Sequence, residues 1–163
     1  MRNLNKKPVL HLLYSDLWQL KHNCFISQLY EVLNQNFSLV LVSKKDLCVG
    51  TYRQPSNTDL VLSVLQQRSW QRVLPFLARF VDKSGLILYD QDPWEAYHDD
   101  SSSPGIYKRL MNLIPVKQFL VTSGWWANYI RDIDCLPVTF VRMGVLARNC
   151  DIGAQYTDRP FEL

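Results

Sequence analysis

Short apolar runs alternate with helix-like segments along the whole chain. The runs that are typical of strands are residues 8–14, 37–43, 59–65, 86–90, 118–123 and 137–143. Near-continuous apolar strands separated by helices are typical of a parallel sheet that helices cover on both faces. The pattern therefore predicts an α/β fold: a Rossmann-like, doubly wound parallel sheet of about six strands in three layers, α/β/α.

The helix-like segments carry apolar positions three or four residues apart. In the helix expected at 25–36, one face is formed by Phe25, Leu29, Val32 and Leu33. A second helix is expected to start at the N-cap candidate Ser69 and to stop at Gly85, with a kink or a later start at Pro75. Two more helices are expected at 106–114 and 125–133, the latter capped by Ser123, whereas 15–23 and 49–58 are expected to be irregular.

Length and composition favour one folded domain. The chain has 163 residues, of which 47% are hydrophobic and 12% aromatic, so disorder is not expected outside the ends. We expect a domain at 1–147 and a tail or linker at 148–163. The net charge is +3, and no basic run exceeds two residues, which argues against a nucleic-acid partner.

Cysteine placement and hydropathy limit the class of protein further. The four cysteines contain no CxxC pair, so neither a zinc site nor a redox motif is predicted, and we expect reduced, mostly packed thiols: Cys24, Cys48, Cys135 and Cys150. The first apolar stretch is broken by His11 and followed by Asp16, unlike a signal peptide. No apolar run approaches the ~18 residues of a membrane span. We therefore expect a cytoplasmic protein, with peripheral membrane association left open.

The fold class directs attention to the loops at the carboxyl ends of the strands, where open parallel sheets bind ligands. These loops are residues 15–18, 90–100, 123–126 and 142–145. The first contains Ser15, Asp16 and Leu17 where a GxGxxG turn would lie, and no GxxxxGK[ST] motif occurs. A nucleotide held by a phosphate loop is therefore disfavoured.

The loop at 90–100 is the richest in candidate chemistry, because it holds five carboxylates and no Lys or Arg. Asp90 and Asp92 form a DxD pair of the kind that coordinates a divalent metal. The alternative is structural: Asp92 shapes the turn before Pro93, and Asp90 forms hydrogen bonds. His98 precedes Asp99, whose carboxylate would orient it as an acid, a base or a sugar-hydroxyl partner, unless it is an ordinary surface histidine.

Tryptophans are the second candidate feature. Trp94, Trp125 and Trp126 would stack on the apolar face of a sugar ring or on a lipid. Adjacent tryptophans at a helix start usually divide between core and rim, so one of Trp125 and Trp126 is expected to be structural. His11 lies mid-strand and is expected to be buried and hydrogen-bonded.

The C-terminal third resembles a known family. The order LILYDQDPWEAY, GIYKRLMNLIPVKQFLVTSGWWANYI and LPVTFVRMGV is similar to the N-terminal domain of two-Rossmann-domain (GT-B) glycosyltransferases, and most to the retaining glycosyltransferase family 4. In that family a strand ends in a serine, as at Ser123, and a last strand ends in a glycine, as at Gly144. The sequence departs from the family at two places. Residues 89–92 stand where the family commonly has a sugar-contacting histidine, a role that only His98 could supply here, and residues 145–147 stand where it often has an aspartate.

The resemblance implies that the chain is the acceptor-binding half of an enzyme that transfers a sugar from a nucleotide-sugar donor to a saccharide or glycolipid. It implies no cofactor and no metal in this domain, since the donor would bind a C-terminal domain of the same chain. The acceptor contacts implied are Asp16, Asp90, Asp92, Trp94, Glu95, His98, Ser123, Trp125 and Trp126. His98 and Asp92 are the catalytic candidates, and Arg142 and Gly144 would line the interdomain cleft.

Two other functions stay open. The first is a single-domain, metal-dependent glycosyltransferase of the GT-A type, in which Asp90 and Asp92 would hold manganese and a nucleotide sugar. The second is a noncatalytic α/β module that uses its aromatic loops to hold a protein partner.

Overall fold

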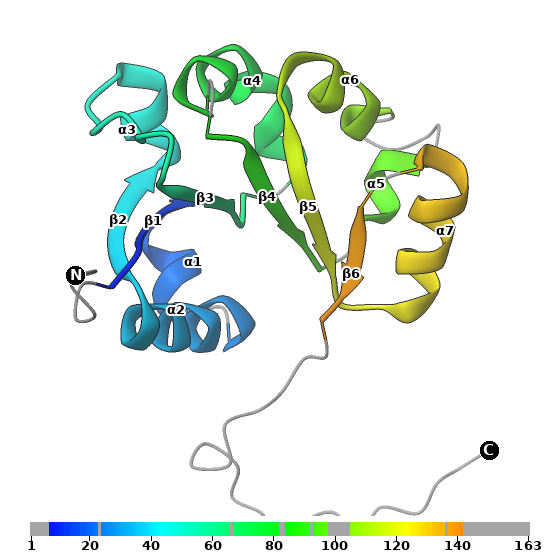
Figure 1. Ribbon diagram of the computed structural model, residues 1–163, viewed down its shortest axis with the longest axis horizontal. Helices are drawn as coiled ribbons and strands as arrows, with labels where there is room; N and C mark the ends of the chain where they lie inside the picture. The colour runs from blue at the N-terminus through cyan, green and yellow to red at the C-terminus, as the bar shows by residue number, and fades with distance from the viewer. Residues whose placement is uncertain are drawn as a thin grey trace, which may run out of the picture.

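The computed structural model describes residues 7–22, 24–65, 67–81, 84–91, 93–97, 105–135 and 137–141. Within them the chain forms one six-stranded, all-parallel sheet with the order β2-β1-β3-β4-β5-β6 (Figure 1). The strands are β1 (Val9–Tyr14), β2 (Ser38–Ser43), β3 (Leu60–Ser63), β4 (Leu86–Asp90), β5 (Val116–Val121) and β6 (Val138–Phe140). Helices flank the sheet on both faces, which confirms the predicted Rossmann-like α/β fold.

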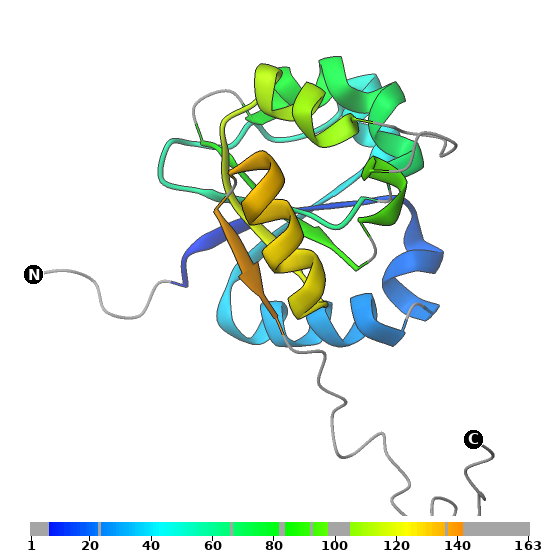
Figure 2. The same ribbon diagram turned by 90° about the vertical axis from the view of Figure 1, so that its right-hand side faces the viewer.

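Seven helices connect the described strands: α1 (Leu17–His22), α2 (Cys24–Asn36), α3 (Lys44–Val49), α4 (Gln67–Val81), α5 (Trp94–Tyr97), α6 (Ile106–Leu113) and α7 (Gly124–Asp134). The first two lie beside β1 and β2 on one face of the sheet (Figures 1 and 2). The other five cover the opposite face. The strand order reverses direction between β1 and β3, so the switch point of the sheet lies between these two strands.

The core divides into two layers because successive strand residues point to opposite faces. Leu13, Leu88 and Phe119 are buried on the α3–α7 face, in one apolar cluster with Trp70 of α4. Leu12 belongs to a second cluster, beneath α1 and α2. These near-continuous apolar strands are what the sequence pattern predicted.

Several local expectations were wrong. Residues 17–22 form α1, where a loop was expected. Residues 44–49 form α3, which was not expected and which begins with a reciprocal capping box between Ser43 and Asp46. Residues 50–58 are irregular, as expected, so only Val49 of the stretch 49–58 is helical. On α2, Ile26 is buried while Val32 is 43% exposed, so the buried face is rotated from the expected one.

The helix α4 also differs from its expected form. It begins at Gln67, before Ser69, and Pro75 lies inside it. Trp70, Val73 and Leu77 are buried on both sides of the proline, and this burial holds the helix together across the missing backbone hydrogen bond.

Two of the cysteines are not packed as expected. Cys48 and Cys135 are free and exposed. The Cys24 side chain and Cys150 lie outside the described structure. Among the described residues, no helix has the length and apolar character needed to cross a membrane.

Candidate functional site

The switch point of the sheet is held together by one glutamine that the sequence analysis missed. Gln19 is buried, and its side-chain oxygen accepts a hydrogen bond from the Ser15 backbone N–H at 2.8 Å. Its amide nitrogen donates to the Val64 carbonyl, also at 2.8 Å. The side chain therefore joins the chain that leaves β1 to the chain that leaves β3, and fixes the geometry of the edge where ligands of this fold class bind.

Two of the predicted acceptor contacts are helix caps. A side-chain oxygen of Asp16 accepts the Gln19 backbone N–H at 2.9 Å, at the start of α1. The Ser123 hydroxyl accepts the Trp126 backbone N–H, which confirms the predicted cap of α7. Both residues lie, as expected, at the edge of the sheet formed by the carboxyl ends of the strands, here called the carboxyl edge. Both side chains accept hydrogen bonds from backbone N–H groups at a helix start.

Asp90 is turned into the α6 layer. It shares a face of β4 with the buried Leu88, and its carboxylate accepts a hydrogen bond from the Tyr107 hydroxyl at 2.6 Å. This contact is the structural alternative that the sequence left open for Asp90. The second member of the DxD pair, Asp92, lies outside the described residues.

An aromatic cluster joins α5 to α7. The Tyr97 hydroxyl donates to a carboxylate oxygen of Asp134, and the Tyr97 ring stacks on Trp126 with centroids 5.6 Å apart. Burial, followed by the neighbouring Asp134 carboxylate, raises the pKa of Tyr97, so its hydroxyl remains a donor. Trp126 is half-buried and packs against the core, and this confirms that one tryptophan of the pair is structural.

The other tryptophan of the pair faces outward, and a counterpart lies on the first helix. Trp125 is 62% exposed, and its ring is stacked on Tyr129 with centroids 5.1 Å apart. Trp18, which the sequence analysis did not select, is 66% exposed. Each is the second residue of a helix that follows a strand, α1 after β1 and α7 after β5. The repeated signal is a tryptophan two or three residues after a serine at a strand end, Ser15 and Ser123.

Two polar atoms at the same edge are buried without a partner among the described residues. They are the Ser15 hydroxyl oxygen and the Gln91 amide nitrogen. The Gln91 backbone carbonyl accepts a hydrogen bond from the Thr122 hydroxyl at 2.9 Å, so the chain after β4 is tied to the chain after β5. The edge thus combines exposed indole rings with unsatisfied hydrogen-bonding groups.

The other predicted site residues remain predictions. Trp94 and Glu95 belong to α5, but their side chains are outside the described structure, as are His98, Asp92, Arg142 and Gly144. Within the described part of the chain, no three His, Cys, Asp or Glu side chains gather as a metal site would require. His11, expected to be buried, is fully buried and bonded to Asp59, although its Nδ1 has no partner there.

The chain is thus an α/β protein with a Rossmann-like, doubly wound sheet. Exposed tryptophans lie at the edge of this sheet where its parallel strands have their carboxyl ends. Comparison with protein-family models, with curated proteins and with solved structures finds no significant match.

Proposed function

We propose that this chain binds a saccharide acceptor, as the acceptor-binding half of a GT-B glycosyltransferase. The observation that carries the proposal is the pair of exposed tryptophans, Trp18 and Trp125, at equivalent positions on the carboxyl edge. Indole rings stack on the apolar faces of sugar rings, and their N–H groups donate to hydroxyls. The strand ends before these helices, on β1 and β5, are three strand spacings, ~14 Å, apart along the sheet, and α1 and α7 lie on opposite faces of it. An acceptor that contacts both tryptophans would therefore cross the edge from one face to the other.

Polar groups between the tryptophans suit the same ligand. Asp16 is exposed beside Trp18, so its carboxylate is within reach of a sugar hydroxyl. The unpartnered Gln91 amide lies after β4, between the two tryptophan-bearing strands. In this proposal Glu95, His98 and Asp92 would add polar contacts, Trp94 a further ring, and Arg142 and Gly144 would face the domain that holds the nucleotide-sugar donor.

A titration of the purified chain with oligosaccharides tests the proposal. The panel would be short glucans, galactans and mannans, and binding would be followed by amide chemical-shift changes. Trp18→Ala and Trp125→Ala are each expected to weaken binding ~3- to 10-fold, the loss of one stacked ring. Phe76→Ala, on the exposed side of α4, is the matched aromatic control and should leave the affinity unchanged.

The proposal fails if no saccharide of the panel binds at millimolar concentration, or if the tryptophan variants bind as well as the parent. A noncatalytic interaction module is the second candidate. It is favoured by Leu17, which is exposed beside Trp18 and gives the edge an apolar character without sugar selectivity. That function predicts no sugar binding at all.

A further inference from the structure

The outer edge of β2 has no partner strand among the described elements. β2 ends the strand order β2-β1-β3-β4-β5-β6, at the left of the sheet in Figure 1. Its sequence, SLVLVS, contains no charged residue and no proline, and its register with β1 runs without a bulge. Charges, prolines and bulges are the usual means by which proteins keep a strand edge from pairing with another chain. The edge of β2 is therefore open to such pairing.

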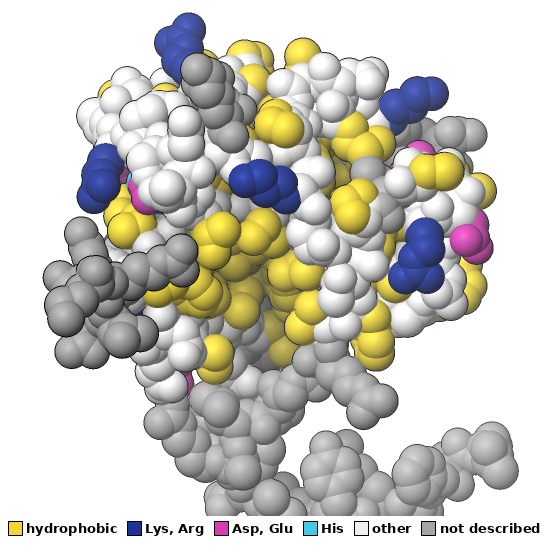
Figure 3. All heavy atoms as spheres, viewed as in Figure 1, with side chains coloured by type: hydrophobic (Ala, Val, Ile, Leu, Met, Phe, Trp, Pro, Cys, Tyr) yellow, Lys and Arg dark blue, Asp and Glu magenta, His cyan; other side chains and the backbone are white. Residues whose placement is uncertain are grey.

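This edge differs from the apolar hollow that Figure 3 shows between α2 and the strands β4, β5 and β6. Apolar side chains accept many partners, and no described residue indicates what would cover that hollow. Backbone N–H and C=O groups are directional, so they require a partner strand in a fixed register. The edge of β2 therefore carries information about its partner that the hollow does not.

Two residues of β2 direct their backbone groups outward. The Ser38 N–H donates to the Pro8 carbonyl at 2.9 Å, so the backbone groups of Ser38 face β1. Because successive strand residues direct these groups to opposite edges, those of Val40 also face β1, while those of Leu39 and Leu41 face away from it. Each leucine presents one N–H and one C=O, so the edge offers four hydrogen-bonding groups.

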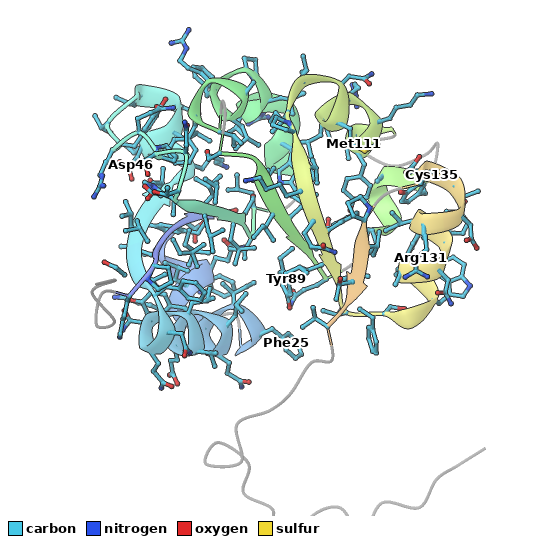
Figure 4. All side chains as sticks on the ribbon, viewed as in Figure 1. Phe25, Asp46, Tyr89, Met111, Arg131 and Cys135 are labelled. Carbon is cyan, nitrogen blue, oxygen red and sulfur yellow. The ribbon has the colours of Figure 1, made fainter. Side chains whose placement is uncertain are left out.

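The N–H groups at both ends of this edge are already occupied. The Phe37 N–H donates to the Leu33 carbonyl at 2.8 Å, at the end of α2. The Ser43 N–H donates to a carboxylate oxygen of Asp46 at 3.2 Å, and Figure 4 shows Asp46 beside the carboxyl end of β2. A partner strand therefore finds complete donor and acceptor pairs only at the two leucines between these ends.

We propose that two copies of the chain pair through their β2 edges as antiparallel strands, around a twofold axis at Val40. In this register Leu39 of one copy lies opposite Leu41 of the other, and the two leucines exchange both of their hydrogen bonds. The axis repeats this exchange, so four bonds form and all four groups are satisfied. A register shifted in either direction would require the occupied N–H of Phe37 or of Ser43. This inference does not depend on the proposed function.

The side chains of the edge also suit a second copy. Leu41 is 40% exposed, and the pairing places it against Leu39 of the other copy, so apolar surface is covered. No charged side chain lies in β2, so no like charges meet within the paired strands. Beyond the strand ends, the same register brings Lys45 of one copy towards Gln35 of the other, and both are exposed. An apolar centre with a polar rim is typical of an interface between proteins.

The size of the edge predicts a reversible dimer. Six residues of ~3.3 Å give a length of ~20 Å, and the sheet with a helical layer on each face is ~30 Å thick. The two copies would therefore bury roughly 600 Å² each, about 1,200 Å² in total, which is the lower limit for a specific interface. The dimer is expected to dissociate in the micromolar range.

Cysteine crosslinking tests the register. With the four native cysteines replaced by serine, Val40→Cys places two thiols across the axis. The Cα atoms of such a non-hydrogen-bonded pair are ~4.5 Å apart, which a disulfide can span, so oxidation should give a covalent dimer in high yield. Ser38→Cys is the matched control. Its equivalent in the other copy lies four residues, ~13 Å, away along the strand, so it should not form a link.

Sedimentation equilibrium of the parent chain gives a second readout that needs no cysteine variant. Leu41→Lys puts a charge into the paired edge and should raise the dimer Kd at least ~10-fold. Ile133→Lys, on the exposed side of α7 at the other end of the sheet, adds the same charge and should leave the Kd unchanged. Three results would each overturn the proposal: a parent chain that stays monomeric up to ~1 mM, equal crosslinking of Val40→Cys and Ser38→Cys, or an unchanged Kd for Leu41→Lys.

Discussion

The imidazole Nε2 of His11 and a carboxylate oxygen of Asp59 lie 3.1 Å apart inside the protein, one on β1 and the other immediately before β3. Both residues are buried. The Asp59 carboxylate also accepts the Ser56 backbone N–H at 3.1 Å and the Ser56 hydroxyl at 2.7 Å. These bonds, the Ser56 contacts first and His11 after them, lower the pKa of Asp59 to about 2.

The free energy of unfolding should depend on pH in part through the ionisation of the Asp59 carboxylate. Because folding lowers the pKa of Asp59, its ionised form stabilises the protein above the unfolded value of ~3.9, and that contribution is lost as the pH falls towards 2. Urea unfolding between pH 5 and pH 2 should show a shallower acid slope for Asp59→Asn than for the parent. Ser56→Ala removes one hydrogen-bond donor to Asp59, so the acid slope of this variant is expected to lie between those of the parent and Asp59→Asn. Equal slopes for all three proteins would contradict the assignment.

Removal of the Gln19 side chain should destabilise the switch point. Gln19→Ala leaves the Ser15 N–H and the Val64 carbonyl without their partner, and unsatisfied buried groups cost about 1–3 kcal/mol. We expect a loss of ~2 kcal/mol in the free energy of unfolding, measured in urea. Gln35→Ala, on the exposed side of α2, is the control and should change it by less than ~0.5 kcal/mol. A similar effect from both variants would refute the role of Gln19.

Replacing Cys135 by glycine should increase the free energy of unfolding. It ends α7 with φ 53° and ψ 33°, and it alone among the described non-glycine residues has a positive φ. Because glycine adopts this conformation without steric cost, Cys135→Gly should stabilise the protein by ~1 kcal/mol and raise Tm by ~2–4 °C.

Cys48 provides the matched control for Cys135, since it is also exposed but lies inside α3. Cys48→Gly places glycine in a helix and should lower stability. Differential scanning calorimetry of the two variants should therefore show opposite changes in Tm. Changes of the same sign would mean that the conformation at Cys135 does not limit stability.

The metal-dependent alternative makes its own prediction about Asp90. Since the Tyr107 hydroxyl occupies one carboxylate oxygen of Asp90, we expect no Mn²⁺-dependent binding of a nucleoside diphosphate in titration calorimetry. Tyr107→Phe should instead cost ~1 kcal/mol of stability, the value of one hydrogen bond. Binding that requires Mn²⁺ and disappears in Asp90→Asn would establish the GT-A type and refute the structural role.

The sequence predicted the sheet well because each strand is a near-continuous apolar run, which a buried parallel strand requires. It missed α1 and α3 because six residues are too few to show a helical period, although the Ser43 and Asp46 capping box marked the second of these helices.

The sequence alone does not decide which polar residues of the candidate site face a ligand, for a physical reason. A carboxylate or hydroxyl at a strand end serves a ligand or the next helix equally well, and the sequence does not distinguish the two. Asp16 and Ser123 cap helices, and Asp90 binds Tyr107. Only tertiary packing shows that Trp126 is turned inward while Trp18 and Trp125 are exposed.

The position of β1 between β2 and β3 has a consequence for synthesis of the chain. At about 5–20 residues per second, β3 leaves the ribosome roughly 2–9 seconds after β1, whereas chain collapse takes about 100 microseconds or less. During those seconds one edge of the apolar run VLHLLY has no partner strand. His11 places a polar group in the middle of that run, which reduces its tendency to aggregate. The nascent chain keeps that protection until Asp59 has been made and the pair closes.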